Sequence, residues 1–162
     1  MPDYAGAVAA IKALLVQNWV DGSGNPKTPI YYANKQPDLP FPPINTATGN
    51  QEPCIICEVT GSKSDVYTFG NAGNRFFVYD GLIVLSCLVA INDGDETAQS
   101  TALAAAEIFR AQTFYVDANG SYIRTVSPNP PDGGTTAAIE GVQAGSSFRV
   151  SCSIPFQYFH RA

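Results

Sequence analysis

The stretch that decides the fold is RFFVYDGLIVLSCLVAI, which runs from Arg75 to Ile91. From Leu82 to Ile91 both the odd and the even positions are apolar, interrupted only by Ser86, which is typical of a strand with both faces covered. At about 3.3 Å per residue the whole stretch would span about 56 Å, too long for one strand in a chain of this size. We therefore expect a central strand with a bend or bulge at Asp80-Gly81.

The N-terminal region has the pattern of a helix. Within residues 3–20, apolar side chains recur at three- and four-residue steps, namely Tyr4, Val8, Ile11, Leu15 and Trp19. This spacing places them on one face of an amphipathic helix. Turn-forming residues at 21–26 end the pattern.

The segment after the central strand predicts a second helix that ends near Gln112. Asp93 or Asp95 is expected to cap it, and Glu96 supplies the negative charge that a helix N-terminus favours. One face carries small residues that let the helix approach a sheet closely, namely Ala98, Ala102 and Ala105, followed by Phe109. Leu103 points nearly the opposite way.

The remaining segments are strands and loops. Expected strands lie at 30–33, 54–60, 114–116, 122–126, 135–143 and 147–159, with an Asp117-Ala118-Asn119-Gly120 hairpin turn between the third and the fourth. Residues 34–53 predict an extended loop, and the polar residues 61–74 a long hairpin loop. The chain is thus expected to form a single α+β domain over residues 1–162, with a mixed or antiparallel sheet and two main helices packed on it.

Composition excludes several classes of protein. The chain has 162 residues, of which 45% are hydrophobic and only 14% charged, and its net charge is −5. A net negative charge opposes stable binding to nucleic acid. The longest apolar run has about half the twenty residues of a membrane helix, and no basic region precedes an apolar stretch at the N-terminus. We expect a protein made in the cytoplasm, without a membrane partner.

No arrangement of residues predicts catalysis, a cofactor or a metal. Cys54-Ile55-Ile56-Cys57 has the spacing of a zinc knuckle, but two β-branched residues favour a strand, in which positions three apart face opposite sides. Buried, reduced cysteines are the preferred interpretation. His160 is the only histidine and lies near a chain end that we expect to be mobile, where it would be poorly held as a general base. We expect a protein that is not an enzyme.

Three segments, in order, resemble the tail-terminator, or tail-completion, proteins of long-tailed bacteriophages. They are RFFVYDGLIVL at 75–85, TALAAAEIF at 101–109 after the Asn92-Asp93-Gly94 turn, and SFRVSCSIPFQY at 147–158. The family has a Gly-bearing strand, a Gly-containing turn, an alanine-rich helix ending in Phe, and a closing strand with a Pro-Phe-aromatic tail.

The resemblance implies a structural protein of the virion tail. Such a protein forms a ring, a hexamer, that caps the head-proximal end of the tail tube, stops tube polymerisation and offers a surface to the head. Its partners are copies of itself, the tail-tube protein and a head-completion or connector protein, while DNA only passes through the lumen. The alternatives are a head-tail connector, a tube subunit, or a small cytoplasmic module with a ligand under the 34–53 loop.

Two surfaces are predicted to make these contacts. The first is the 61–74 loop, whose aromatic side chains a soluble monomer gains little by exposing. Its candidate residues are Lys63, Asp65, Tyr67, Phe69 and Arg75. The second is the outward edge of the second helix, where Leu103 resembles an apolar anchor with a charged rim formed by Glu107 and Arg110.

Overall fold

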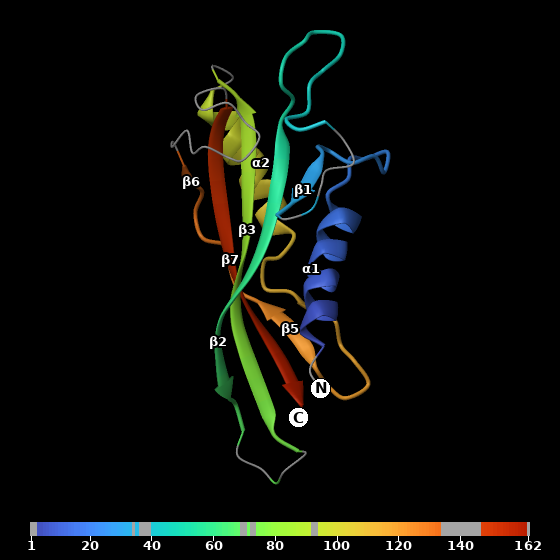
Figure 1. Cartoon of the computed structure of the whole chain (residues 1–162), viewed down its shortest axis with the longest axis vertical. Helices are drawn as coiled ribbons and strands as arrows, with labels where there is room; N and C mark the ends of the chain where they lie inside the picture. The colour runs from blue at the N-terminus through green and yellow to red at the C-terminus, as the bar shows by residue number, and fades with distance from the viewer. Residues whose placement is uncertain are drawn as a thin grey trace.

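The computed structural model describes residues 3–33, 35, 40–68, 71, 74–91, 94–133 and 147–161, and the molecule is elongated (Figure 1). In these residues two helices pack on one strongly curled, mixed sheet of seven strands, which confirms the α+β fold. The helices are α1 (Tyr4–Asn18) and α2 (Asp95–Glu107). The strands are β1 (Ile30–Tyr32), β2 (Cys54–Val66), β3 (Phe76–Ala90), β4 (Thr113–Phe114), β5 (Tyr122–Thr125), β6 (Asp132–Gly133) and β7 (Ser147–Arg161).

The strand predicted to be central is central. β3 lies between β2 and β7, pairs with both in antiparallel register, and is paired with β7 along its whole length, from Phe76 opposite Arg161 to Ala90 opposite Ser147. The strand order is β1-β2-β3-β7-β5-β4, and β6 pairs with β7. β1 runs parallel to β2 and makes the sheet mixed.

The predicted irregularity occurs at the expected level of the sheet but in the neighbouring strand. β3 is a single strand of 15 residues, so the expectation that this stretch is too long for one strand is wrong. The register shifts instead in β2, between Gly61 and Lys63, opposite Gly81 and Asp80. A Cβ on Gly81 would lie 2.5 Å from the Phe156 ring and 2.5 Å from the Thr60 carbonyl oxygen. Glycine is therefore required there by close packing.

The predicted 61–74 loop is mostly strand. β2 continues to Val66 and β3 begins at Phe76, so the two strands form a long hairpin that extends to the bottom of the molecule in Figure 1. Its outer part, residues 62–67 with 75–80, is here called the hairpin arm. Residues 61–66 are mostly polar and exposed, so their side chains do not indicate a strand. They form a strand because their backbone pairs with that of β3. Phe69 lies outside the described residues.

Both helices pack on the same face of the sheet. The core contains Ala7, Ile11 and Leu15 of α1 and four alanines of α2, together with Phe109, which is fully buried. The sheet contributes to the same core the odd-numbered residues of β3 from Ile83 to Val89 and the even-numbered residues of β7 from Val150 to Tyr158. The predicted apolar face of α2 is thus confirmed, whereas Val8 of α1 is only half-buried.

The ends of α2 differ from the prediction. The N-cap is Gly94, which makes no side-chain cap, and Asp95 lies inside the first turn; Asp93 is outside the described residues. The helix ends at Glu107 rather than near Gln112, and the chain tightens into turns in which Arg110 N–H donates to the Glu107 carbonyl. No Gly or Pro marks this end; the chain must reverse there to pair Thr113 with Arg124.

The described residues between α2 and β7 form three short strands, of which β5 and β6 pair with β7. β4 and β5 form the predicted hairpin around Asp117, whose carboxylate accepts hydrogen bonds from the Asn119 and Ser121 amides at 2.8 Å each. β6 was not predicted, and the strand expected at 135–143 lies outside the described residues. The closing strand is confirmed and runs to Arg161.

Candidate functional site

The first predicted surface is the outer part of the hairpin arm. Lys63 and Asp65 form an exposed ion pair of 2.5 Å, and the hydrogen bond to Asp65 raises the pKa of Lys63. Beyond them Val66 and Tyr67 are 51% and 61% exposed. Arg75 is also exposed. The arm therefore presents two large side chains to solvent beside one neutralised pair of charges.

Tyr67 is held in place despite its exposure. Its ring lies edge-on to Phe159 at 5.0 Å between centroids, and the opposite neighbour of Phe159 is Tyr122, stacked at 4.7 Å. An exposed ring that already has a fixed orientation loses little side-chain entropy when a partner covers it. This makes Tyr67 the best-placed contact residue of the arm.

The second predicted surface is the outward side of α2. Glu96, Ser100, Leu103 and Glu107 are all exposed and follow one another at steps of four, three and four residues, so they form one line along the helix, here called the α2 stripe. Leu103 is 38% exposed. The prediction that Leu103 points away from the sheet is therefore confirmed; its role as an anchor stays a prediction.

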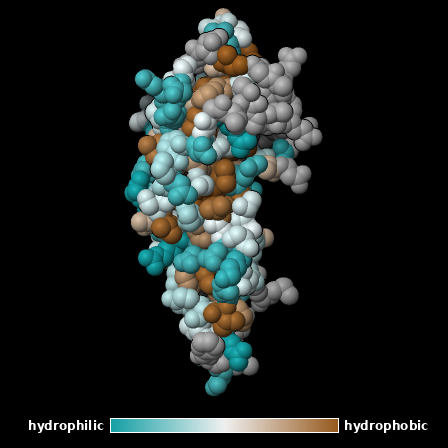
Figure 2. Space-filling view, turned by 90° about the vertical axis from the view of Figure 1, so that its left-hand side faces the viewer, coloured by the Kyte–Doolittle hydropathy of each residue, from teal (hydrophilic) through white to brown (hydrophobic). Residues whose placement is uncertain are grey.

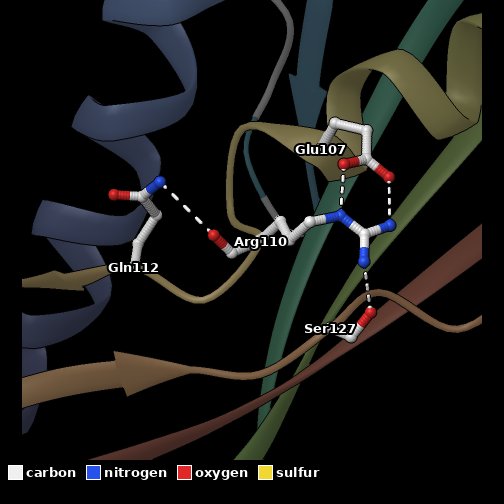
Figure 3. A network of polar contacts seen from close by, with 4 residues as sticks. All are labelled: Glu107, Arg110, Gln112 and Ser127. Atoms are coloured by element: carbon white, nitrogen blue, oxygen red, sulfur yellow. Dashed lines mark hydrogen bonds and ion pairs between the residues drawn. The ribbon is translucent and has the colours of Figure 1, made fainter.

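Glu107 and Arg110 are paired with each other (Figure 3). The guanidinium also donates to Ser127 Oγ at 2.6 Å, and Gln112 Nε2 donates to the Arg110 carbonyl at 3.3 Å. The hydrogen bond from Arg110 lowers the pKa of Glu107. Both side chains remain exposed, and their pairing ties the end of α2 to the segment after β5.

The structure does not bring the two predicted surfaces together. α2 lies at the upper end of the molecule in Figure 1, behind the sheet, and the hairpin arm reaches the lower end. They can therefore contact two different neighbours at once.

A third surface was missed by the sequence reasoning. The sheet face opposite the helices, here called the open face, carries Leu82, which is 37% exposed, and the half-buried Val84 and Pro155. Seen from the side away from α1, apolar patches are spaced along the long axis between polar side chains (Figure 2). The alternation of β7 was the sequence signal for it, because the even positions from 150 to 156 are apolar and the odd positions 149, 151, 153 and 157 are polar.

The upper part of the open face is covered by the chain itself. Phe41 packs edge-on against Tyr31 at 4.8 Å between ring centroids, and both lie against the buried Cys54 and Leu88. Phe41 of the predicted 34–53 loop is therefore packed on the sheet, whereas residues 46–50 of the loop are exposed.

His160 contradicts the prediction of a mobile position. It is 2% exposed in β7, with its ring 4.6 Å from that of Tyr79 and stacked on Phe77 at 5.6 Å. Neither ring nitrogen has a hydrogen-bond partner among the described residues, and burial lowers the pKa of the imidazole. The histidine is therefore held neutral among aromatic rings.

The four cysteines are buried and reduced, and the geometry predicted for the first two is confirmed. Cys54 lies in the small cluster under Phe41 and Cys57 in the main core, on opposite sides of β2. Burial raises the pKa of the Cys54, Cys57 and Cys87 thiols to about 12, so they stay protonated at neutral pH.

A shallow groove of about 380 Å³ lies beside the base of the hairpin arm and is lined by Tyr4, Gly61, Ser62, Lys63, Ser64, Tyr79 and Asp80. In the described part of the chain, no group of three or more His, Cys, Asp or Glu side chains could hold a metal ion. None of the described helices is long and apolar enough to cross a membrane.

The fold of this chain is similar to that of a solved structure. No protein-family model matches the sequence, and no curated protein does. A solved structure of a protein that carries no functional name is similar, with a TM-score of 0.55 and 15% sequence identity, over 93% of this chain and 92% of that one. At this identity the likeness shows the fold alone, and it spans nearly the whole length of both chains.

Proposed function

We propose that this protein is a tail terminator of a long-tailed bacteriophage, a structural subunit whose ring caps the tail tube and stops its polymerisation. The observation that carries the proposal is where the resembling segments lie. Residues 75–85, 101–109 and 147–158 form most of β3, α2 and β7, and these three elements build the centre of the domain. The resemblance therefore concerns one packed unit and not scattered surface residues.

The hairpin arm supports a role in assembly. It extends past the helices and ends in exposed apolar side chains, Val66 and Tyr67. Aromatic residues are enriched at protein interfaces, where they bury much area at small entropic cost. An arm of this kind suits contact with a neighbouring subunit or with the last ring of the tube.

The charge supports passage of DNA without binding. The net charge is −5, so the phosphate backbone has no overall attraction for the subunit. A ring that lets DNA slide through its lumen needs this property, whereas a stable DNA-binding protein would carry the opposite charge.

Termination of tube growth tests the proposal directly. The purified chain is added to tube subunits of the same phage while they polymerise, and tube length is measured by electron microscopy. We expect growth to stop, with added density at one tube end. Unaltered tube growth would overturn the proposal, and tubes formed by this chain alone would make it a tube subunit instead.

A matched pair of variants links the effect to the arm. Val66→Asp places a charge on the arm, and Val116→Asp places the same charge on the 71% exposed Val116 of the 115–121 turn. We expect the first variant to lose capping and the second to keep it. Equal capping by both would remove the arm from the mechanism.

A further inference from the structure

The turn between β4 and β5 contains the dipeptide Asn119-Gly120, the single place in the sequence where glycine follows asparagine. Both residues are exposed. The Asn119 carboxamide forms no hydrogen bond with a described residue, so the described part of the chain does not fix its orientation. An exposed carboxamide that is not held in place is open to attack by a neighbouring nucleophile.

The neighbouring nucleophile is the backbone nitrogen of Gly120. A bond from this nitrogen to the Asn119 Cγ atom closes a succinimide ring, and a side chain on the following residue hinders that closure. Gly120 has no Cβ, and its φ of +79° lies in the left-handed region where glycine is favoured. The residue that the turn geometry requires therefore also leaves its nitrogen unshielded.

The other described asparagines lack this combination. Asn25 and Asn129 precede prolines, whose nitrogen has no hydrogen to lose. The carboxamides of Asn18 and Asn45 are held in hydrogen bonds to other residues. The remaining described asparagines, each followed by a residue with a side chain, are Asn50, Asn71 and Asn74. The chemistry is therefore expected at position 119.

The turn must open before the Gly120 nitrogen can react. Gly120 N–H donates to the Asp117 carbonyl oxygen at 3.1 Å. The surrounding hairpin is short, since β4 has two residues and pairs only with the four-residue β5 among the described strands. Tyr115, directly after β4, has a φ of +54°, which is a strained conformation for a residue with a Cβ. Short, exposed elements of this kind open locally without global unfolding.

We propose that Asn119 converts spontaneously to aspartate and isoaspartate in the folded protein. Hydroxide takes the proton from the Gly120 nitrogen, which attacks Asn119 Cγ. The new C–N bond forms as the Cγ–Nδ2 bond breaks, and Nδ2 takes a proton from water and leaves as ammonia, which restores the hydroxide. Water then opens the succinimide. Cleavage of the bond to Cγ gives aspartate, whereas cleavage of the bond to the backbone carbonyl carbon gives isoaspartate.

The conversion changes the turn in two ways. Each converted chain gains one negative charge, so its net charge goes from −5 to −6, and the new carboxylate lies near that of Asp117. Isoaspartate also adds a methylene to the backbone, which displaces the N–H groups that Asp117 binds. The turn follows Tyr115, whose hydroxyl donates to the Asp3 carboxylate at 2.8 Å. The inference concerns the chain alone and is independent of the tail-terminator function.

Incubation of the purified, folded chain tests the proposal. The protein is kept at neutral and at mildly alkaline pH in heavy-oxygen water, and is then digested briefly with trypsin in ordinary water. Cleavage after Arg110 and Arg124 releases residues 111–124 as one peptide. By mass spectrometry we expect the amide of Asn119 to be replaced by an acid that carries one heavy oxygen. Two chromatographic forms should appear, and the rate should rise in proportion to the hydroxide concentration.

Asn119→Gln is the matched control. Its carboxamide is one methylene farther from the Gly120 nitrogen and would have to close a larger ring. We expect it to keep its amide over the time in which half of the wild-type chains convert. Asn129, in the next tryptic peptide, precedes Pro130 and is the control within the same sample.

A parallel incubation in urea gives the rate of the unfolded chain, and circular dichroism verifies that the other samples stay folded. We expect the folded chain to convert more slowly than the unfolded one, because the turn must open first, but at a measurable rate. A folded chain that keeps its amide while the unfolded chain converts would overturn the proposal. So would an acid without heavy oxygen, or equal conversion at Asn119 and Asn129.

Discussion

The two faces of the paired strands β3 and β7 differ in burial and in residue type. The helix-covered face contains Ile83, Leu85, Ile154 and Phe156, each no more than 1% exposed, whereas the open face carries Leu82, Arg149 and Ser151 at the alternate positions. Apolar side chains on the first face are excluded from water within the subunit. Those at Leu82 and Val84 on the second face remain partly in contact with water. The covered face is therefore expected to contribute more to stability than the open face.

The largest effect is expected from truncation on the covered face. Phe156→Ala removes a ring that is 1% exposed and packs over Gly81, so the free energy of unfolding should fall by about 3–5 kcal/mol. Leu82→Ala, on the open face of the same ladder, should cost less, because the residue is already 37% exposed. Urea denaturation measures both, and equal losses would contradict the distinction between the faces.

A smaller loss is expected from adding one methyl group where the covered face is tightest. Gly81→Ala places a Cβ against Phe156 and the Thr60 carbonyl oxygen, and overpacking of this kind costs about 1–3 kcal/mol. Gly22→Ala is the matched control, since no atom lies within 4 Å of the added Cβ. Its stability should be unchanged or slightly higher. A Gly81→Ala protein as stable as the wild type would show that the sheet can relax there.

The covered face should also make stability depend on pH. Burial lowers the pKa of His160 in the folded state, so near pH 6 the unfolded chain binds a proton that the folded chain does not. Stability from this group is full above pH 6.5 and falls below it, at most by about 1.4 kcal/mol per pH unit. Thermal melts between pH 7.5 and 5 measure the slope. His160→Phe should flatten it, and an unchanged slope would assign the dependence to carboxylates.

The smallest effect is expected on the outward side of α2. Glu107→Gln removes the charge that pairs with Arg110, but both groups are exposed, and surface pairs of this kind contribute little to folding. The thermal melting temperature should stay within experimental error of the wild type in high and low salt. A clear loss of stability would mean that the link from Arg110 to Ser127 holds the end of α2 in place.

Elements with strong periodicity were predictable from the sequence. The apolar steps of α1, the small-residue face of α2 and the continuous apolar run of β3 each follow from local pattern. The predicted face of α2 is buried as expected, whereas Val8 of α1 is only half-buried and Leu82 leaves the second face of β3 partly exposed. The hydrophobic effect acts on side chains according to their spacing, so a regular pattern specifies both the element and its buried side. Burial of Cys54 and Cys57 on opposite sides of β2 follows from the same rule.

Tertiary structure decided the features for which local pattern carries no information. The polar residues 61–66 become strand because they pair with β3. The register shift falls in β2, next to Gly81 of β3, where a Cβ would collide with Phe156. His160 is buried because aromatic side chains from other segments surround it. The sheet has an open face because both helices pack on its other face. Such outcomes depend on contacts between distant segments, and those contacts exist only after the chain has folded.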